Sequence, residues 1–151
     1  LQELFPMGEV LSDVHWETHD GRTRLPTHLQ EAHTAESCRG KAGITFGRQI
    51  GAYPILIGAE YHIPLESQSD IVVTGHGARS ITGVEVGMNI ETMSQKQLEA
   101  IPGIGEKTAW KLISQRAKRR SRGKTPFETA QSWFEATSVE WNDNHSVYFH
   151  S

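Results

Sequence analysis

The sequence has few of the features that mark secreted, membrane-bound or disulfide-rich proteins. Its 151 residues include one cysteine, Cys38, so no internal disulfide can form. No apolar run approaches the roughly 20 residues that cross a bilayer, and the opening residues 1–3 are acidic where a signal peptide would be basic. These absences predict a soluble cytoplasmic chain with no membrane partner. The lack of an initial methionine predicts a piece of a longer protein.

Motifs for enzymatic chemistry are also missing. The sequence contains no GxSxG nucleophile elbow and no Walker phosphate loop. The Gly-Ile-Gly at 103–105 follows a helical pattern rather than a strand, which excludes a dinucleotide fingerprint. For an enzyme complete in this chain, the candidate carboxylates are Asp13, Glu17 and Asp70, and no spacing recommends them. We therefore predict no catalytic residues here.

Eight histidines raise the question of a metal site. His15 and His19 are four residues apart, but on a strand this spacing separates them by roughly 13 Å, too far to share one zinc ion. The glutamate between them is displaced by one position from that of the HExxH metalloprotease motif. We predict no metal and no cofactor in this chain.

Charge is distributed unevenly along the chain. Residues 94–124 carry nine basic and two acidic residues, a net charge of +7, in a chain whose formal net charge is −3. Residues 1–93 carry −6 and residues 125–151 carry −4. Such an asymmetry bears on partners rather than on fold, and one basic block between two acidic ones favours a polyanionic ligand.

The first part of the sequence has the pattern of short strands. Residues 9–25 alternate partly between apolar and polar and contain an Asp-Gly turn, while residues 26–43 show no period and predict a loop. Apolar runs at 53–58, 70–74 and 80–86 predict further strands, the last two joined by the glycine-rich turn 75–79. Strands at this spacing predict a small β-barrel-like or curled-sheet domain over residues 1–90.

The second part has helix start and stop signals. Ser94 with Gln97 forms a capping-box pattern, and the turn 102–105 ends one helix and begins another at Gly105 or Glu106. That second helix should bury Ala109, Leu112 and Ile113, with Trp110 a further candidate. Residues 125–128 (Thr-Pro-Phe-Glu) predict a third helix to about 136 that buries Phe127, Ala130 and Phe134. The predicted fold class is α+β, with a three-helix module over 91–137 and a flexible tail over 138–151.

The turn at 102–105 predicts an anion site. A helix that starts at a glycine leaves backbone N–H groups without partners, and its dipole favours negative charge there. The alternatives are a hairpin that only packs helices and a basic run that is a solvated helix end. Phosphate contact explains the number of like charges better. The predicted nucleic-acid-binding residues are Gly103, Ile104, Gly105, Lys107, Thr108, Lys111, Arg116, Lys118, Arg119, Arg120, Arg122 and Lys124.

Residues 94–136 resemble the helix-hairpin-helix family. The matching positions are Leu98, the run Ile-Pro-Gly-Ile-Gly at 101–105, Lys107, Ala109 and Ile113. The resemblance implies binding to the nucleic-acid backbone without reading sequence. It implies that N–H groups near the two glycines face a phosphate oxygen, and that Lys107 adds a charge-assisted contact.

A second resemblance covers more of the chain. Residues 45–58 and 70–84, followed by the hairpin, are similar to the C-terminal region of archaeal-type radical-SAM proteins, in which a small OB-like β domain precedes a helix-hairpin-helix. This implies a secondary nucleic-acid face at Arg48, His76 and Arg79, although a tight hairpin turn with solvated polar side chains explains His76 and Arg79 better. The three-cysteine motif CxxxCxxC that would hold an iron–sulfur cluster is absent.

Together these observations predict the substrate-binding part of a larger radical-SAM-like protein. It would bind nucleic acid through backbone phosphates, with DNA predicted as the partner in preference to RNA. An attached or upstream domain would supply the chemistry. The first alternative is a protein-interaction module that uses the basic patch to dock an acidic partner. The second is a nucleic-acid repair or modification enzyme complete in this chain.

Overall fold

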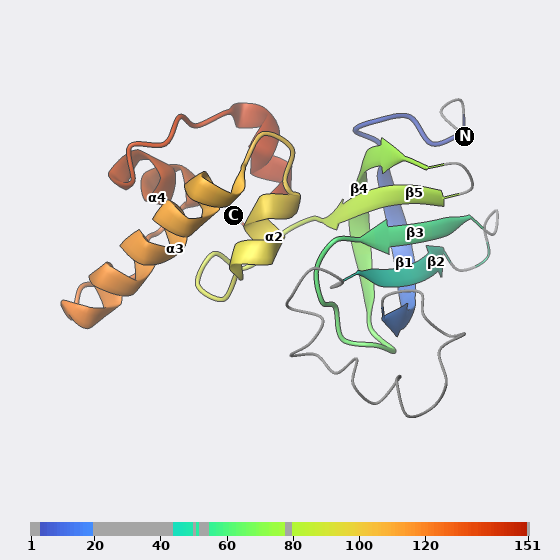
Figure 1. Cartoon of the computed structure of the whole chain (residues 1–151), viewed down its shortest axis with the longest axis horizontal. Helices are drawn as coiled ribbons and strands as arrows, with labels where there is room; N and C mark the ends of the chain where they lie inside the picture. The colour runs from blue at the N-terminus through green and yellow to red at the C-terminus, as the bar shows by residue number, and fades with distance from the viewer. Residues whose placement is uncertain (1–3, 20–43, 50, 52–54, 78–79, 151) are drawn as a thin grey trace. The chain divides into compact units, whose positions relative to one another are not determined.

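A computed structural model describes residues 4–19, 44–49, 51, 55–77 and 80–150 (Figure 1). It divides into two compact units, residues 1–85 and 86–151. The first unit contains the strands and the second contains the helices. The predicted loop over 26–43, the Asp-Gly turn at 20–21 and the start of the predicted strand at 53–54 lie outside the described residues.

The five strands that the structure describes in the first unit form a closed barrel. They are β1 (Val10–His19), β2 (Thr45–Gln49), β3 (Leu56–Ala59), β4 (Gln68–His76) and β5 (Ser80–Glu85). Their order around the barrel is β1-β2-β3-β5-β4, with β3 and β5 parallel and the other described pairs antiparallel (Figure 1). This order, closed between β1 and β4, is the strand arrangement of the OB-fold.

Apolar side chains at alternate positions of these strands fill the barrel. Val14 and Trp16 of β1 are completely buried, as are Ile57 of β3 and Ile71 of β4. Strand β1 closes the barrel by pairing with β2 on one side and with β4 on the other, and its pairing with β4 shifts in register between Leu11 and Val14. Asp13 within this shift has φ of +56°, and its N–H donates to the carboxylate of Asp70 at 3.0 Å. Bulges of this kind bend a strand and increase its local twist.

The second unit contains three α-helices and a 3₁₀ helix. The helices are α2 (Gln95–Ala100), α3 (Glu106–Ser121) and α4 (Ala130–Ala136), followed by the 3₁₀ segment η2 (Asp143–Tyr148). Their core contains Leu98, Leu112, Trp133 and Phe134, all fully buried. No helix in the described part of the chain is long and apolar enough to cross a membrane.

The predicted fold class is wrong. A closed five-stranded barrel is followed by a few short helices, and these do not form a three-helix helix-hairpin-helix module. The sheet closes instead of remaining curled because β1 pairs with both β2 and β4. Helix α4 begins four residues later than the predicted Pro126, because Thr129 and Ser132 form the capping box.

The segment predicted as a flexible tail packs onto the rest of its unit. Tyr148 and Phe149 are buried, and Met88 and Phe149 form a parallel β-bridge. The ring of Phe149 contacts Phe134 of α4 at 5.6 Å between centroids, and Trp141 contacts both rings. The aromatic residues of 138–151 are widely spaced, so this segment of the sequence shows no apolar period. In the structure Trp141 and Phe149 nevertheless both pack on Phe134 of α4.

Candidate nucleic-acid interface

The turn between α2 and α3 is held from inside by two isoleucines. Ile101 ends α2, and its carbonyl accepts a hydrogen bond from the Ile104 N–H at 3.0 Å. Both side chains are buried. Between them Gly103 has φ of +92°, a conformation that favours glycine. The apolar side chains therefore point inward while the backbone of Pro102, Gly103 and Gly105 is exposed.

Helix α3 begins without a side-chain cap. Ser94 caps α2 and Thr129 caps α4, each within a complete capping box, whereas the N-cap of α3 is Gly105 with no side-chain hydrogen bond. The first bond of the helix runs from the Ala109 N–H to the Gly105 carbonyl at 2.9 Å. The N–H groups of residues 106–108 are therefore available to an external anion.

Three lysines lie on the exposed side of α3. Lys107 is in the first turn, and Lys111 and Lys118 follow at spacings of four and seven residues, which place all three on one face of the helix. Thr108 is half-buried beside them. Each lysine is exposed, and its side chain makes no hydrogen bond or ion pair with the described residues. This face combines mobile positive charges with the uncapped helix end, as a phosphate-binding surface requires.

Arg116, a predicted phosphate contact, faces inward instead. Its guanidinium donates to the carbonyl oxygens of Ile90 at 2.9 Å and Met93 at 2.7 Å, and it lies 5.5 Å from the ring centroid of Trp133. Burial lowers the pKa of Arg116 from its ordinary value, and the positive charge of Arg120 lowers it further. Arg116 therefore ties α3 to the segment before α2, and it is removed from the candidate interface.

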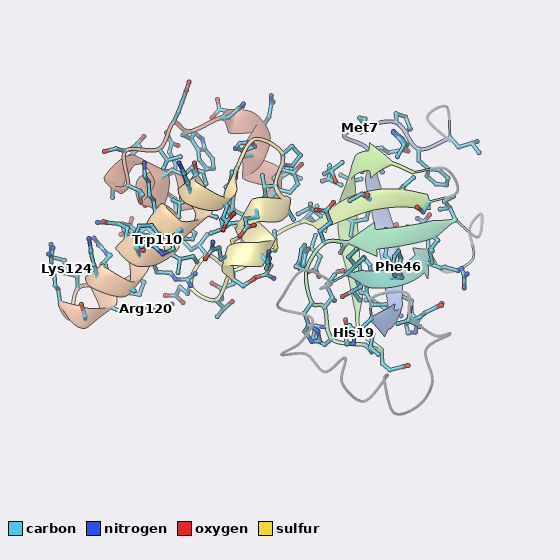
Figure 2. The ribbon with its side chains drawn as sticks, in the orientation of Figure 1. Met7, His19, Phe46, Trp110, Arg120 and Lys124 are labelled. Atoms are coloured by element: carbon cyan, nitrogen blue, oxygen red, sulfur yellow. The ribbon has the colours of Figure 1, made fainter. Side chains whose placement is uncertain are left out.

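Two further predicted contacts, Arg119 and Arg120, also bind backbone. The Arg119 Nε donates to the Thr125 carbonyl, and its guanidinium lies 4.4 Å from the centroid of the Phe127 ring. Arg120 donates to the Glu91 carbonyl. The Arg119 bond ties the chain that follows α3 back to the helix, and the Arg120 bond ties α3 to the segment before α2. Of the predicted cations past Lys118, Arg122 and Lys124 remain exposed, and their side chains have no hydrogen-bond or ion-pair partner in the described structure; Figure 2 shows Lys124 beyond the end of α3.

His145, which the sequence prediction missed, supports the turn. Its Nε2 lies 2.9 Å from the Pro102 carbonyl oxygen, and its ring would be 3.6 Å from a Cβ placed on Gly103. Because a carbonyl oxygen only accepts, the imidazole donates from Nε2. The residue is 43 positions from Pro102 and lies in η2. No local pattern in the sequence could have indicated this contact.

The structure describes two of the three residues of the predicted secondary face, Arg48 and His76. Arg48 on β2 forms an ion pair with Glu17 at 3.3 Å, and His76 at the end of β4 bonds to the Phe5 carbonyl through Nε2. Their strands are not neighbours in the closed barrel, because β1 lies between β2 and β4 on one side and β3 and β5 lie between them on the other. Arg79 lies outside the described residues.

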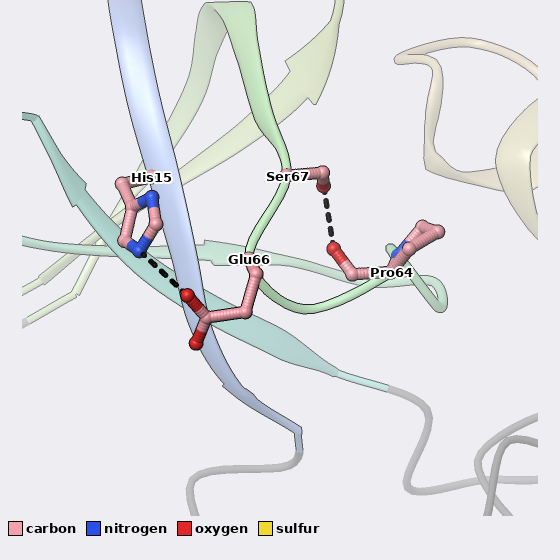
Figure 3. Close-up of polar contacts among 4 residues, drawn as sticks. All are labelled: His15, Pro64, Glu66 and Ser67. Atoms are coloured by element: carbon pink, nitrogen blue, oxygen red, sulfur yellow. Dashed lines mark hydrogen bonds and ion pairs between the residues drawn. The ribbon is translucent and has the colours of Figure 1, made fainter.

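The candidate carboxylates and histidines of the barrel have structural partners. Asp70 accepts from the Asp13 backbone. His15 of β1 points to the Glu66 carboxylate in the connection before β4, with 3.8 Å between Nε2 and Oε2, and the Ser67 hydroxyl bonds to the Pro64 carbonyl within that connection (Figure 3). His19 bonds to the Ile63 carbonyl. The residues described here contain no group of three His, Cys, Asp or Glu that could hold a metal ion.

Comparison with known proteins assigns no family. No family model and no solved structure matches the sequence. The chain is similar to an uncharacterized protein of Archaeoglobus fulgidus, with 35% identity over 60 residues. This match covers 40% of the chain and 11% of the archaeal protein, so the aligned part is a small portion of that protein's length.

Proposed function

We propose that the second unit binds nucleic acid through backbone phosphates, without reading base sequence and with DNA ahead of RNA. The uncapped start of α3 carries this proposal. Glycine at the N-cap leaves three N–H groups available, and Lys107 in the same turn supplies a positive charge. Helices α2 and α4 both carry a full capping box, so among the helices that the structure describes the missing cap is particular to α3.

The sharpest test replaces the missing cap. A Cβ on Gly105 would meet no atom within 4 Å, and its φ of −87° suits any residue. In Gly105→Asp, the new carboxylate accepts hydrogen bonds from the free N–H groups at the start of α3. We therefore expect the protein to become more stable by a few tenths of a kcal/mol, while its affinity for nucleic acid falls at least tenfold. Gly105→Ala is the matched control, because it adds a Cβ without a cap. Equal affinities for the two variants would contradict the proposal.

Salt dependence provides a second measurement. Five exposed cations of this region, in the part of the chain that the structure describes, make no bond to the protein: Lys107, Lys111, Lys118, Arg122 and Lys124. If all five contact phosphate, the logarithm of the binding constant should fall against the logarithm of salt concentration with a slope of about −4.5 for duplex DNA. A flat response would contradict phosphate binding. Nucleic acid that co-purifies with the protein, and that nuclease removes, would argue against an acidic protein as the partner.

The sequence resemblance supports a wider proposal for the parent protein. We infer a larger, cytoplasmic radical-SAM-like protein in which this chain holds the substrate and another domain performs the chemistry. The lone Cys38 agrees with a reducing compartment and cannot by itself hold an iron–sulfur cluster. A CxxxCxxC motif elsewhere in the natural gene product would support this inference, and a complete gene product without one would contradict it.

A further inference from the structure

Trp110 differs from the other three tryptophans of the chain. Trp16 and Trp133 are fully buried and donate from the indole N–H to Ser69 and Leu112, and Trp141 donates to Asp143. The side chain of Trp110 is 60% exposed on α3, and its indole has no hydrogen-bond partner in the described structure (Figure 2). An exposed indole of this kind contributes little to the core and is available to a ligand.

Trp110 lines an open groove between α3 and the end of α4. The groove encloses about 830 Å³ including its open mouth. Lys111, Ser114 and Lys118 line it from α3, and Thr137 and Ser138 line it from the chain that leaves α4. Its lining residues include two lysines and no carboxylate. The surface therefore offers one aromatic face, positive charge and hydroxyl groups together.

We infer that this groove binds an unpaired nucleotide, with the base stacked on Trp110 and the phosphates near Lys111 and Lys118. A base inside a duplex is already stacked on its neighbours and cannot lie on the indole, so the ligand is a single-stranded segment. Stacking of a base on an exposed aromatic is a recurrent way to bind single strands without reading sequence. An acidic peptide would use the lysines but has no need of the indole.

The geometry connects this groove with the start of α3. Trp110 follows Lys107 by three residues, a rise of about 4.5 Å along the helix, and lies next to Lys111. A strand with one phosphate at the uncapped helix end can therefore extend toward the groove. The inference rests on the proposed function for its class of ligand, while its own evidence is the indole and the groove.

The test compares single-stranded and duplex DNA of equal length by fluorescence anisotropy, with the full chain. We expect Trp110→Ala to weaken binding of an oligothymidylate about tenfold and to leave blunt duplex affinity unchanged, because only the single strand can stack. Trp110→Phe should retain most of the affinity. Val147→Ala is the control for an exposed apolar residue of the same unit, since Val147 is 38% exposed. Thermal unfolding should be unaffected by all three changes.

The outcomes separate the two proposals. If Gly105→Asp weakens duplex binding but Trp110→Ala changes nothing, the phosphate site stands and the stacking inference is wrong. If Trp110→Ala weakens single strand and duplex equally, stacking is also wrong. If neither form of DNA binds, the proposed function fails as well. Competition by polyglutamate that depends on Trp110 would overturn the inference in favour of an acidic peptide.

Discussion

The imidazole Nε2 of His145 lies 2.9 Å from the carbonyl oxygen of Pro102, so the last segment of the chain holds the turn that precedes α3. The contact restrains the backbone on the side of Gly103, where φ is +92°. A phosphate site made of backbone N–H groups depends on such restraint, because a mobile turn would lose entropy on binding.

Loss of this contact should weaken both folding and binding. We expect His145→Ala to lower the free energy of unfolding by about 1 kcal/mol, the usual net value of one hydrogen bond. Nucleic-acid affinity should fall severalfold, because the turn becomes less ordered. His150→Ala provides the control, since His150 is also a histidine of the last segment but is exposed. Equal affinities of the two variants would show that the turn needs no such support.

Arg116 and Arg122 should show opposite effects. Arg116→Met removes two hydrogen bonds to carbonyl groups, and we expect a loss of about 2 kcal/mol in urea unfolding. Arg122→Met, at an exposed position, should leave stability within about 0.5 kcal/mol but weaken DNA binding. A large loss of stability in Arg122→Met would contradict this division of the basic block.

Ser138 is strained at the end of α4. Its φ is +61°, and the Val139 N–H bonds back to the Phe134 carbonyl at 2.9 Å, as in a helix end that prefers glycine. We expect Ser138→Gly to stabilise the protein by about 1 kcal/mol in thermal unfolding. Ser138→Ala keeps the Cβ and should give no gain, so equal stabilisation by both variants would reject strain as the cause.

Tyr61 should make the barrel sensitive to alkali. Burial raises the pKa of its hydroxyl well above the ordinary value of 10.0, and the charge of Glu85 adds to this effect. The folded barrel therefore holds the proton more tightly than the unfolded chain. The contribution of Tyr61 to the free energy of unfolding should be present in full below about pH 10, the ordinary pKa of the hydroxyl in the unfolded chain. It should be lost as the pH rises from there toward the higher pKa of the folded state. Urea unfolding at pH 8 to 11 measures this change.

Tyr61→Phe separates titration from the hydrogen bond. The hydroxyl accepts from the Glu85 N–H at 2.9 Å, so the variant should lose about 1 kcal/mol at neutral pH. Its stability should then decline less between pH 9 and 11 than that of the parent protein. An unchanged pH profile would assign the alkaline loss to another group.

Local signals in the sequence predicted local structure well. The capping box at Ser94 is confirmed, because its hydroxyl accepts from the Gln97 N–H at 3.1 Å. The start of α3 at Glu106 is confirmed too. The start signal at 125–128 failed, because Arg119 binds the Thr125 carbonyl and lies over Phe127. That competing contact comes from an earlier helix, and no short pattern reveals it.

The candidate site shows the same limit. The net charge of the basic block does not distinguish an arginine that is available to a ligand from one that is bound within the protein. Arg116, Arg119 and Arg120 donate hydrogen bonds to backbone carbonyl groups of their own unit. Trp110, a further candidate for the apolar face of α3, is exposed, whereas Ala109 and Leu112 are fully buried. Which side of a helix a residue faces depends on partners that are distant in the sequence.

The closure of the barrel has a consequence for the order of folding. Val10 of β1 pairs with Val72 of β4, which is 62 positions later in the sequence. Strand β3 pairs directly with β5, although β4 lies between them in the sequence. The first strand therefore cannot complete its pairing during synthesis until most of the unit has left the ribosome. Helices α2 and α3 are separated in the sequence only by residues 101–105, and contacts between such neighbouring elements form quickly. We expect the helical unit to fold faster than the barrel, although it is synthesised after it.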